Sequence, residues 1–153
     1  MRWADDFFGK AKIRDILCSV TRRVNGWPET MVLKGNTYYV KSVSYNADRN
    51  LYFQGVDPGK LIQKGDYVLL CGGFNNELAD IFIIPWEIFF RTLKQGEPTN
   101  TYKPPKKYLQ YKFYVRDRSG RWVMTVQGGK RPVIDVTKWR YASSEAIEQL
   151  KAN

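Results

Sequence analysis

Residues 66–86 read DYVLLCGGFNNELADIFIIPW, two apolar runs separated by a polar loop that contains glycine. The run at 66–71 is almost continuously apolar, which is typical of a strand buried on both faces of a sheet. The run at 81–84 has the same character, and Pro85 ends it because proline cannot donate a sheet hydrogen bond and fits the start of a helix. We therefore predict two central strands, followed by a helix over residues 86–94.

Further elements are expected on both sides of this stretch. Upstream, apolar side chains at helical spacing predict a helix over 11–25, and β-branched and aromatic residues predict a hairpin over 31–45 and a strand over 51–54. Downstream, we expect strands over 111–116, 121–126 and 132–136 and a helix over 143–151. The predicted fold class is α+β with an α/β-like core. It is a mixed central β-sheet flanked by an N-terminal helix and the helix after the Ile-Pro strand, with a basic C-terminal β-hairpin extension.

The length of 153 residues fits a single domain. Within it we distinguish a core at 1–96, a basic, proline-rich connector at 97–107, and a basic β extension with a terminal helix at 108–153. The chain is 43% hydrophobic and 15% aromatic, so it can bury a substantial core despite its charge.

Positive charge is concentrated in the last third of the chain. The net charge is +10, and residues 102–140 hold eleven Lys and Arg against two Asp, whereas residues 27–101 hold seven basic and eight acidic residues. Such a cluster predicts a polyanionic partner, and nucleic acid is favoured over an anionic membrane. The alternative is a solvated basic surface without a polyanion.

Cysteine and histidine usage narrows the chemistry. Cys18 and Cys71 lie in apolar segments and are too few for a disulfide framework or a zinc site, so we expect free, buried thiols. The chain begins without a signal peptide and has no apolar run of transmembrane length, which predicts a cytoplasmic protein. Histidine is absent, so any catalysis must use carboxylates, Lys, Tyr, Ser or Cys.

The order of elements between Pro28 and Leu93 resembles the restriction-endonuclease-like, or PD-(D/E)xK, superfamily. The resemblance is to its small resolvase-like branch, which contains many phage and mobile-element proteins. Pro28-Glu29 on the first hairpin strand and Lys41 on the second stand where that family has an acid and its lysine. Tyr39 occupies the position of the second acid, so the motif is degenerate.

The resemblance implies a Mg²⁺-dependent endodeoxyribonuclease in which Glu29 binds the metal and Lys41 stabilises charge on the phosphate. Because tyrosine does not replace a carboxylate as a Mg²⁺ ligand, a relocated acid (Asp15, Asp48 or Asp57) would have to complete the site. Glu29 and Lys41 can equally be solvated strand residues, and binding without catalysis is the favoured hypothesis.

The basic tail alternates charged and aromatic side chains. On the expected strand 111–116, Tyr111, Phe113 and Val115 share one face, while Lys112, Tyr114 and Arg116 share the other. The first face suits a core, and the second suits a phosphate backbone. The predicted nucleic-acid-binding residues are Lys106, Lys107, Lys112, Arg116, Arg118, Arg121, Lys130 and Arg131.

The leading hypothesis is a DNA-binding protein that holds duplex or branched DNA mainly through phosphate contacts. RNA is an alternative ligand, a membrane is not expected, and a homodimer stays open. Three other functions remain alternatives: an active Mg²⁺-dependent endonuclease, a non-enzymatic β-barrel reader of modified DNA or RNA, and a protein that binds an acidic partner.

Overall fold

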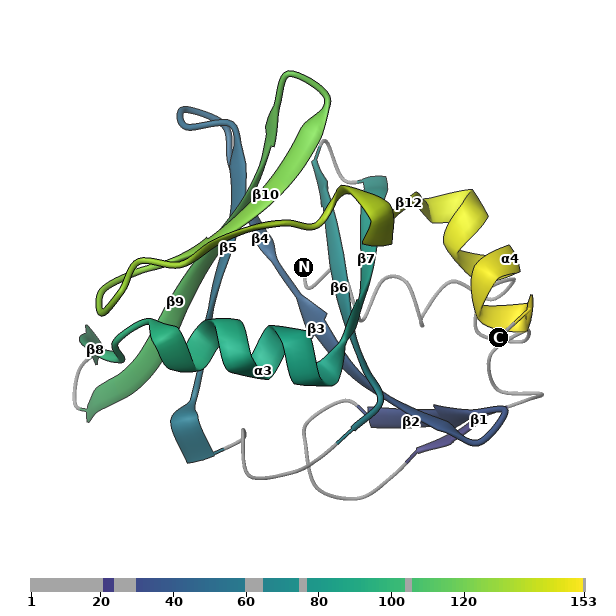
Figure 1. Cartoon of the computed structure of the whole chain (residues 1–153), viewed down its shortest axis with the longest axis horizontal. Coiled ribbons are helices and arrows are strands. Elements are labelled where there is room, and N and C mark those ends of the chain that lie inside the picture. The colour runs from purple at the N-terminus through teal and green to yellow at the C-terminus, as the bar shows by residue number, and fades with distance from the viewer. Residues whose placement is uncertain (1–20, 24–29, 60–64, 75–76, 104–105, 153) are drawn as a thin grey trace.

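The computed structural model describes residues 21–23, 30–59, 65–74, 77–103 and 106–152, which form two β-sheets and associated helices (Figure 1). Sheet A contains, from edge to edge, β1 (Thr21–Arg23), β2 (Thr30–Leu33), β3 (Asn36–Ser42), β6 (Tyr67–Phe74), β7 (Glu77–Pro85) and β12 (Arg140–Ala142). Sheet B contains, in this order, β11 (Val133–Asp135), β10 (Arg121–Val126), β9 (Lys106–Arg118), β5 (Leu51–Val56) and β4 (Ser44–Asn46), and β8 (Thr99–Lys103) also pairs with β9. The helices are α3 (Trp86–Gln95), α4 (Ser143–Ala152) and the short 3₁₀ helix η2 (Thr137–Trp139).

This arrangement confirms the α+β fold class. Sheet A is mixed, because β3 and β6 run parallel while its other neighbouring strands are antiparallel. The predicted hairpin over 31–45 is present as β2 and β3, and the predicted strands at 51–54, 66–71 and 81–84 are β5, β6 and β7. The strands do not close into a barrel in the part of the chain that the structure describes, so the barrel of the modified-base reader is not found.

Sheet A is buried on both faces, as the apolar run at 66–71 predicts. Val68 and Leu70 of β6 lie in the core between the two sheets, whereas Leu69 and Cys71 lie in a second core on the opposite face. Ala146 and Leu150 of α4 cover this second core. Cys71 is free and buried, and Cys18 lies outside the described residues.

Helix α3 begins and ends within one residue of its predicted limits. Pro85 precedes it, and Gly96 follows its last residue. Trp86, Phe89 and Leu93 lie on one side of the helix and are buried in the core between the sheets. This apolar face follows from the spacing i, i+3 and i+7.

Two hairpins turn through only two residues each. Lys34 and Gly35 connect β2 to β3 with φ of 50° and 81°, and Ser119 and Gly120 connect β9 to β10 with φ of 54° and 87°. Positive φ at both central positions is the type I′ geometry that matches the twist of the flanking strands. Glycine adopts this backbone without steric cost, which explains its place at the second position of each turn.

The predicted helix over 11–25 is wrong at its C-terminal end. Thr21–Arg23 is strand β1, which pairs antiparallel with Met31–Leu33, and residues 11–20 lie outside the described residues. Hydrogen bonding to a neighbouring strand overrides the local helical periodicity there, as tertiary contacts commonly do.

The connector and the C-terminal extension are also more structured than the sequence indicates. Residues 99–103 of the connector form β8, and β9 already begins at Lys106. The extension is part of the core, because β5 pairs with β9 from Tyr52–Val115 to Val56–Tyr111. The short strands β4 and β12 were not predicted, since three residues carry too little periodicity to identify a strand.

Within the described residues, no helix has both the length and the apolar character needed to cross a membrane.

Gly72 provides a test of the packing between the sheets. A Cβ atom at this position would lie 2.7 Å from the Tyr52 ring and 2.9 Å from the Val43 side chain, both of which are buried. We expect Gly72→Ala to lower the free energy of unfolding by about 1–3 kcal/mol, because overpacking forces the core to shift. Urea denaturation measures this change. The control Ser44→Ala, at an exposed strand position, should stay within about 0.5 kcal/mol. Equal effects of the two substitutions would contradict the tight contact.

Candidate nucleic-acid interface

Strand β9 has the two-faced pattern that the sequence predicts. Tyr111, Phe113 and Val115 are buried and pack in the core between the sheets. Lys112, Tyr114 and Arg116 alternate with them and are half-buried. Since successive side chains of a strand point to opposite faces, these three lie on the side of sheet B that faces away from the core. We call this side the outer face of sheet B.

Strand pairing adds residues from the neighbouring strands to the outer face. Arg116 lies opposite Val123 of β10, and Arg118 lies opposite Arg121 across the hairpin. One row crosses four strands, because Phe53 pairs with Tyr114, Tyr114 with Thr125, and Thr125 with Val133. The outer face therefore comprises Phe53, Lys112, Tyr114, Arg116, Arg118, Arg121, Val123, Thr125, Val133 and Asp135.

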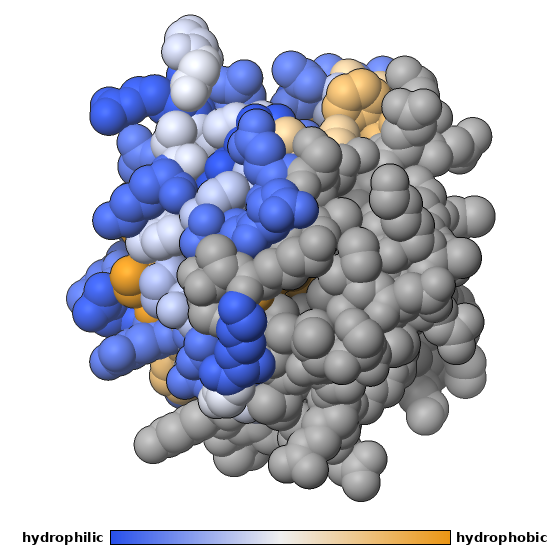
Figure 2. Space-filling model, turned by 90° about the vertical axis from the view of Figure 1, so that its right-hand side faces the viewer, coloured by the Kyte–Doolittle hydropathy of each residue, from blue (hydrophilic) through white to orange (hydrophobic). Residues whose placement is uncertain are grey.

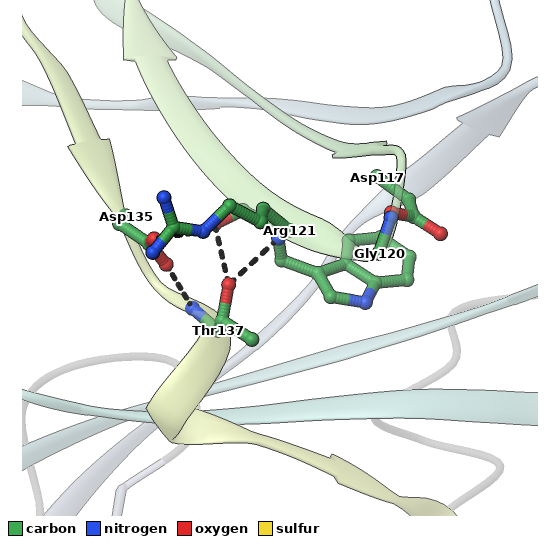
Figure 3. Close-up of polar contacts among 6 residues, drawn as sticks. Asp117, Gly120, Arg121, Asp135 and Thr137 are labelled. Atoms are coloured by element: carbon green, nitrogen blue, oxygen red, sulfur yellow. Dashed lines mark hydrogen bonds and ion pairs between the residues drawn. The ribbon is translucent and has the colours of Figure 1, made fainter.

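The tip of the β9–β10 hairpin is fixed by local hydrogen bonds (Figure 3). The Gly120 N–H donates to Asp117 Oδ1 at 2.8 Å. The Trp122 N–H donates to Thr137 Oγ1 at 2.8 Å, and the Thr137 N–H donates to Asp135 Oδ1 at 2.9 Å. These contacts hold the first residues of β10 against the segment that follows β11.

Arg121 forms an ion pair with Asp135, in which the Arg121 Nε lies 3.4 Å from the Asp135 Oδ2. Hydrogen bonds from Thr137, together with the charge of Arg121, lower the pKa of the Asp135 carboxyl. The two side chains are 77% and 44% exposed, so water screens their attraction. Arg121 can therefore exchange this carboxylate for another anion at small cost.

The remaining predicted binding residues lie toward the other end of β9. Lys130 and Arg131 are exposed in the turn after β10, where the Lys130 N–H donates to Gln95 O and the Arg131 N–H to Gly128 O, both at 2.9 Å. Lys106 and Lys107 belong to β9, but their side chains lie outside the described part of the structure. The predicted residues thus follow the length of the β9–β10 hairpin.

The opposite side of the molecule, where α4 lies, shows mostly hydrophilic residues where it is described, with small hydrophobic areas (Figure 2).

Arg140, a further basic residue of the tail, is paired with the buried carboxylate of Asp80. Its Nε and Nη2 donate to Asp80 Oδ1 at 2.8 and 2.5 Å, and the Asp80 side chain is only 6% exposed. The Tyr52 hydroxyl donates to the other oxygen, Oδ2, at 2.5 Å. Asp80 therefore joins β7 and β12 of sheet A to β5 of sheet B.

Burial, the hydrogen bond to Asp80 and the charge of that carboxylate raise the pKa of Tyr52 well above its usual value. The phenol stays protonated at neutral pH and remains a donor. Trp122 stacks on Tyr52 with ring centroids 6.1 Å apart, and the Arg140 guanidinium lies 5.8 Å from the Trp122 centroid. The cluster is thus charge-balanced and enclosed by rings, which suits a structural link between the sheets.

The nuclease-like motif is placed only in part. Lys41 is half-buried on β3, and alternation puts it on the same face as the buried residues Tyr39 and Val43. The Tyr39 ring stacks on Trp86 at 4.7 Å, and burial raises the pKa of its phenol. Tyr39 is therefore a neutral core residue at the position of the second acid. Glu29 lies outside the described residues.

The relocated acids do not assemble a metal site in the described part of the chain. Asp48 is exposed between β4 and β5, and Asp57 is exposed after β5, where its Oδ1 accepts the Gly59 N–H at 2.8 Å. Asp15 lies outside the described residues. Among the residues described, no three His, Cys, Asp or Glu side chains come close enough to hold a metal ion. These residues therefore do not fit a Mg²⁺ site on their own, and catalysis by Glu29 and Lys41 stays a prediction.

Three features of the interface and its support were not assigned from sequence. Phe53 is not among the predicted binding residues, and it is 38% exposed on the outer face. Arg49 lies outside the basic tail, and its guanidinium is 5.6 Å from the centroid of the Tyr114 ring. Asp80 and Arg140 are 60 residues apart in the sequence. An acid within an apolar strand is costly to bury without a partner, and this cost is the one signal in the sequence that indicates a partner for Asp80.

No protein-family model, curated protein or solved structure matches the chain.

The two tyrosines of the β4–β5 hairpin allow a matched test of the link between the sheets. Tyr52→Phe removes the hydrogen bond to buried Asp80, and we expect it to lower the free energy of unfolding by about 1.5–3 kcal/mol, the usual range for a bond to a charged group. Tyr45→Phe removes an exposed hydrogen bond to Asn50, so its effect should stay within about 0.5 kcal/mol. Chemical denaturation compares them, and equal midpoints would refute the role given to Asp80.

Proposed function

We propose that the protein binds nucleic acid, with DNA as the main ligand, through the outer face of sheet B. The observation that carries this proposal is the alignment of Lys112, Arg116, Arg118 and Arg121 along one face of the β9–β10 hairpin. Neutralising phosphates with such side chains releases condensed counterions, which is the main source of affinity for a polyanion.

The charges of this face are largely uncompensated. Among the described residues, Arg121 pairs with Asp135, whereas Lys112, Arg116 and Arg118 form no ion pair with another described residue. Arg49 adds a further exposed cation above Tyr114. Among the described residues of this face, Asp135 is the acid that a phosphate would have to displace.

The dimensions of the hairpin suit an extended ligand. Strand β10 has six residues, which corresponds to a length of about 20 Å at roughly 3.3 Å per residue. DNA rises 3.4 Å per nucleotide along each strand, so the face spans about six nucleotides. Arg118 and Arg121 at one end of this face and Lys112 toward the other fit contacts to successive phosphates.

Several finer statements accompany this proposal. Contacts to phosphates carry no base information, so we propose binding with little sequence preference. RNA is an alternative ligand, and a homodimer is an alternative to a monomer. A cytoplasmic location is proposed from the cysteine usage.

Removing two cations from the interface should weaken binding and flatten its salt dependence. For the double variant Lys112→Gln/Arg118→Gln, we expect the slope of log K against log[salt] for a 20-base-pair duplex to fall by about 1–2, because each lost phosphate contact removes about 0.9. Fluorescence anisotropy at 50–200 mM salt measures the slope.

The control for this experiment is Lys34→Gln/Arg91→Gln, which removes the same charge from exposed positions elsewhere. Lys34 lies in the β2–β3 turn of sheet A, and Arg91 lies on α3, whose apolar face packs on the core side of sheet B. The control should retain the slope of the wild-type protein. Similar losses in both double variants would mean that net charge, and not this face, governs binding.

A further inference from the structure

The outer face of sheet B exposes large hydrophobic side chains between its cations. Phe53 is 38% exposed on β5, which lies between β9 and β4. Val133 is 57% exposed on β11, at the edge of sheet B. Phosphate binding alone gives no reason for these side chains. The following inference rests on the proposed function and concerns the kind of nucleic acid that this face accepts.

Phe53 and Val133 belong to one row of side chains across sheet B, and this row also contains the ring of Tyr114. Phe53 lies directly opposite Tyr114, and the row continues through Thr125 to Val133. Directly opposed residues of neighbouring strands have their Cβ atoms about 5 Å apart, so the Phe53 and Tyr114 side chains start from neighbouring positions on the outer face. The Tyr114 hydroxyl bonds to Gln127 Oε1 at 3.2 Å, which holds this ring on the sheet.

Cations flank the aromatic pair along the strand. Lys112 and Arg116 lie two residues before and two residues after Tyr114 on the same face of β9, at a distance of about 7 Å along the strand on each side. Arg49 lies over the Tyr114 ring. Rings combined with flanking cations are the side chains with which proteins hold the bases and the backbone of a single strand.

A duplex would not use these rings. Within double-stranded DNA, away from its ends, the faces of the bases are stacked on one another, so a protein ring finds a free π-face on an unpaired base. Placing a duplex backbone over Phe53 would instead bring phosphates against an apolar surface. The hydrophobic row therefore distinguishes single-stranded from duplex ligands, whereas the cations alone do not.

We propose that the outer face of sheet B binds unpaired nucleotides, with a base stacked on Phe53 and phosphates held by Lys112 and Arg116. The ligand is a single-stranded stretch of nucleic acid, such as the unpaired part of a branched DNA.

The test compares Phe53→Ala with the wild-type protein on two fluorescein-labelled probes, a 20-nucleotide oligo-dT and a blunt 20-base-pair duplex. Loss of a stacking ring should weaken oligo-dT binding by about fivefold to a hundredfold and duplex binding by less than about twofold. Because Phe53 is partly exposed, the variant should fold, and thermal denaturation checks this.

Two further substitutions separate the ring from general effects. Phe53→Trp keeps a stacking surface and should retain oligo-dT affinity, whereas Phe53→Leu keeps only the apolar contact and should weaken binding like alanine. Phe74→Ala removes a ring that is 45% exposed but lies at the end of β6 in sheet A, and it should leave oligo-dT affinity unchanged.

The outcomes distinguish this inference from the proposed function. Equal losses on both probes, or no loss with Phe53→Ala, would overturn stacking on Phe53 while leaving phosphate binding intact. Failure of the wild-type protein to bind either probe at 50 mM salt would overturn the proposed function itself. A selective loss on oligo-dT that Phe53→Trp restores supports the inference.

Discussion

The carboxylate of Asp80 is the interaction on which the relation between the two sheets depends. It accepts hydrogen bonds from Arg140 of its own sheet and from Tyr52 of the other. A buried carboxylate without hydrogen-bond donors is strongly unfavourable. The Asp80 carboxylate receives all its donors only when β5, β7 and β12 meet in one arrangement. Hydrophobic packing alone tolerates sliding, whereas a three-residue polar cluster specifies how the sheets align.

That alignment gives sheet B two different faces. Its inner face completes the core with Phe113, Val115 and Met124, and its outer face carries cations and partly exposed rings. The same strand alternation thus serves stability on one side and the proposed binding on the other. Sheet A has no comparable outer surface over β6, because α4 covers its second face.

Much of this organisation could be predicted from sequence, for physical reasons that differ between elements. The apolar runs of β6 and β7 and the proline before α3 are local signals, and the alternation from Tyr111 to Arg116 correctly separated the buried from the outward face. The pairing of β5 with β9 could not be predicted, because the same alternation suits any partner strand. Consequently Phe53, which lies far from the basic tail in sequence, was not associated with it.

Other parts escaped prediction because tertiary contacts decided them. Thr21–Arg23 forms a strand against β2 despite helical spacing, and Arg140, one of the basic residues of the tail, pairs with buried Asp80. The nuclease-like motif shows the limit of order-of-elements reasoning. The position that would need a carboxylate is Tyr39, a core ring stacked on Trp86, and Glu29 lies outside the described residues.

The pairing between Tyr52 and Val115 has a consequence for how the molecule assembles. It joins segments separated by more than sixty residues, whereas the two-residue turns at Lys34-Gly35 and Ser119-Gly120 join strands that are adjacent in the chain. Closing a long loop loses more chain entropy than closing a tight turn, and contacts distant in sequence slow folding. The β9–β10 hairpin can therefore form early by itself, while the row from Phe53 to Val133 exists only after β5 has paired with β9.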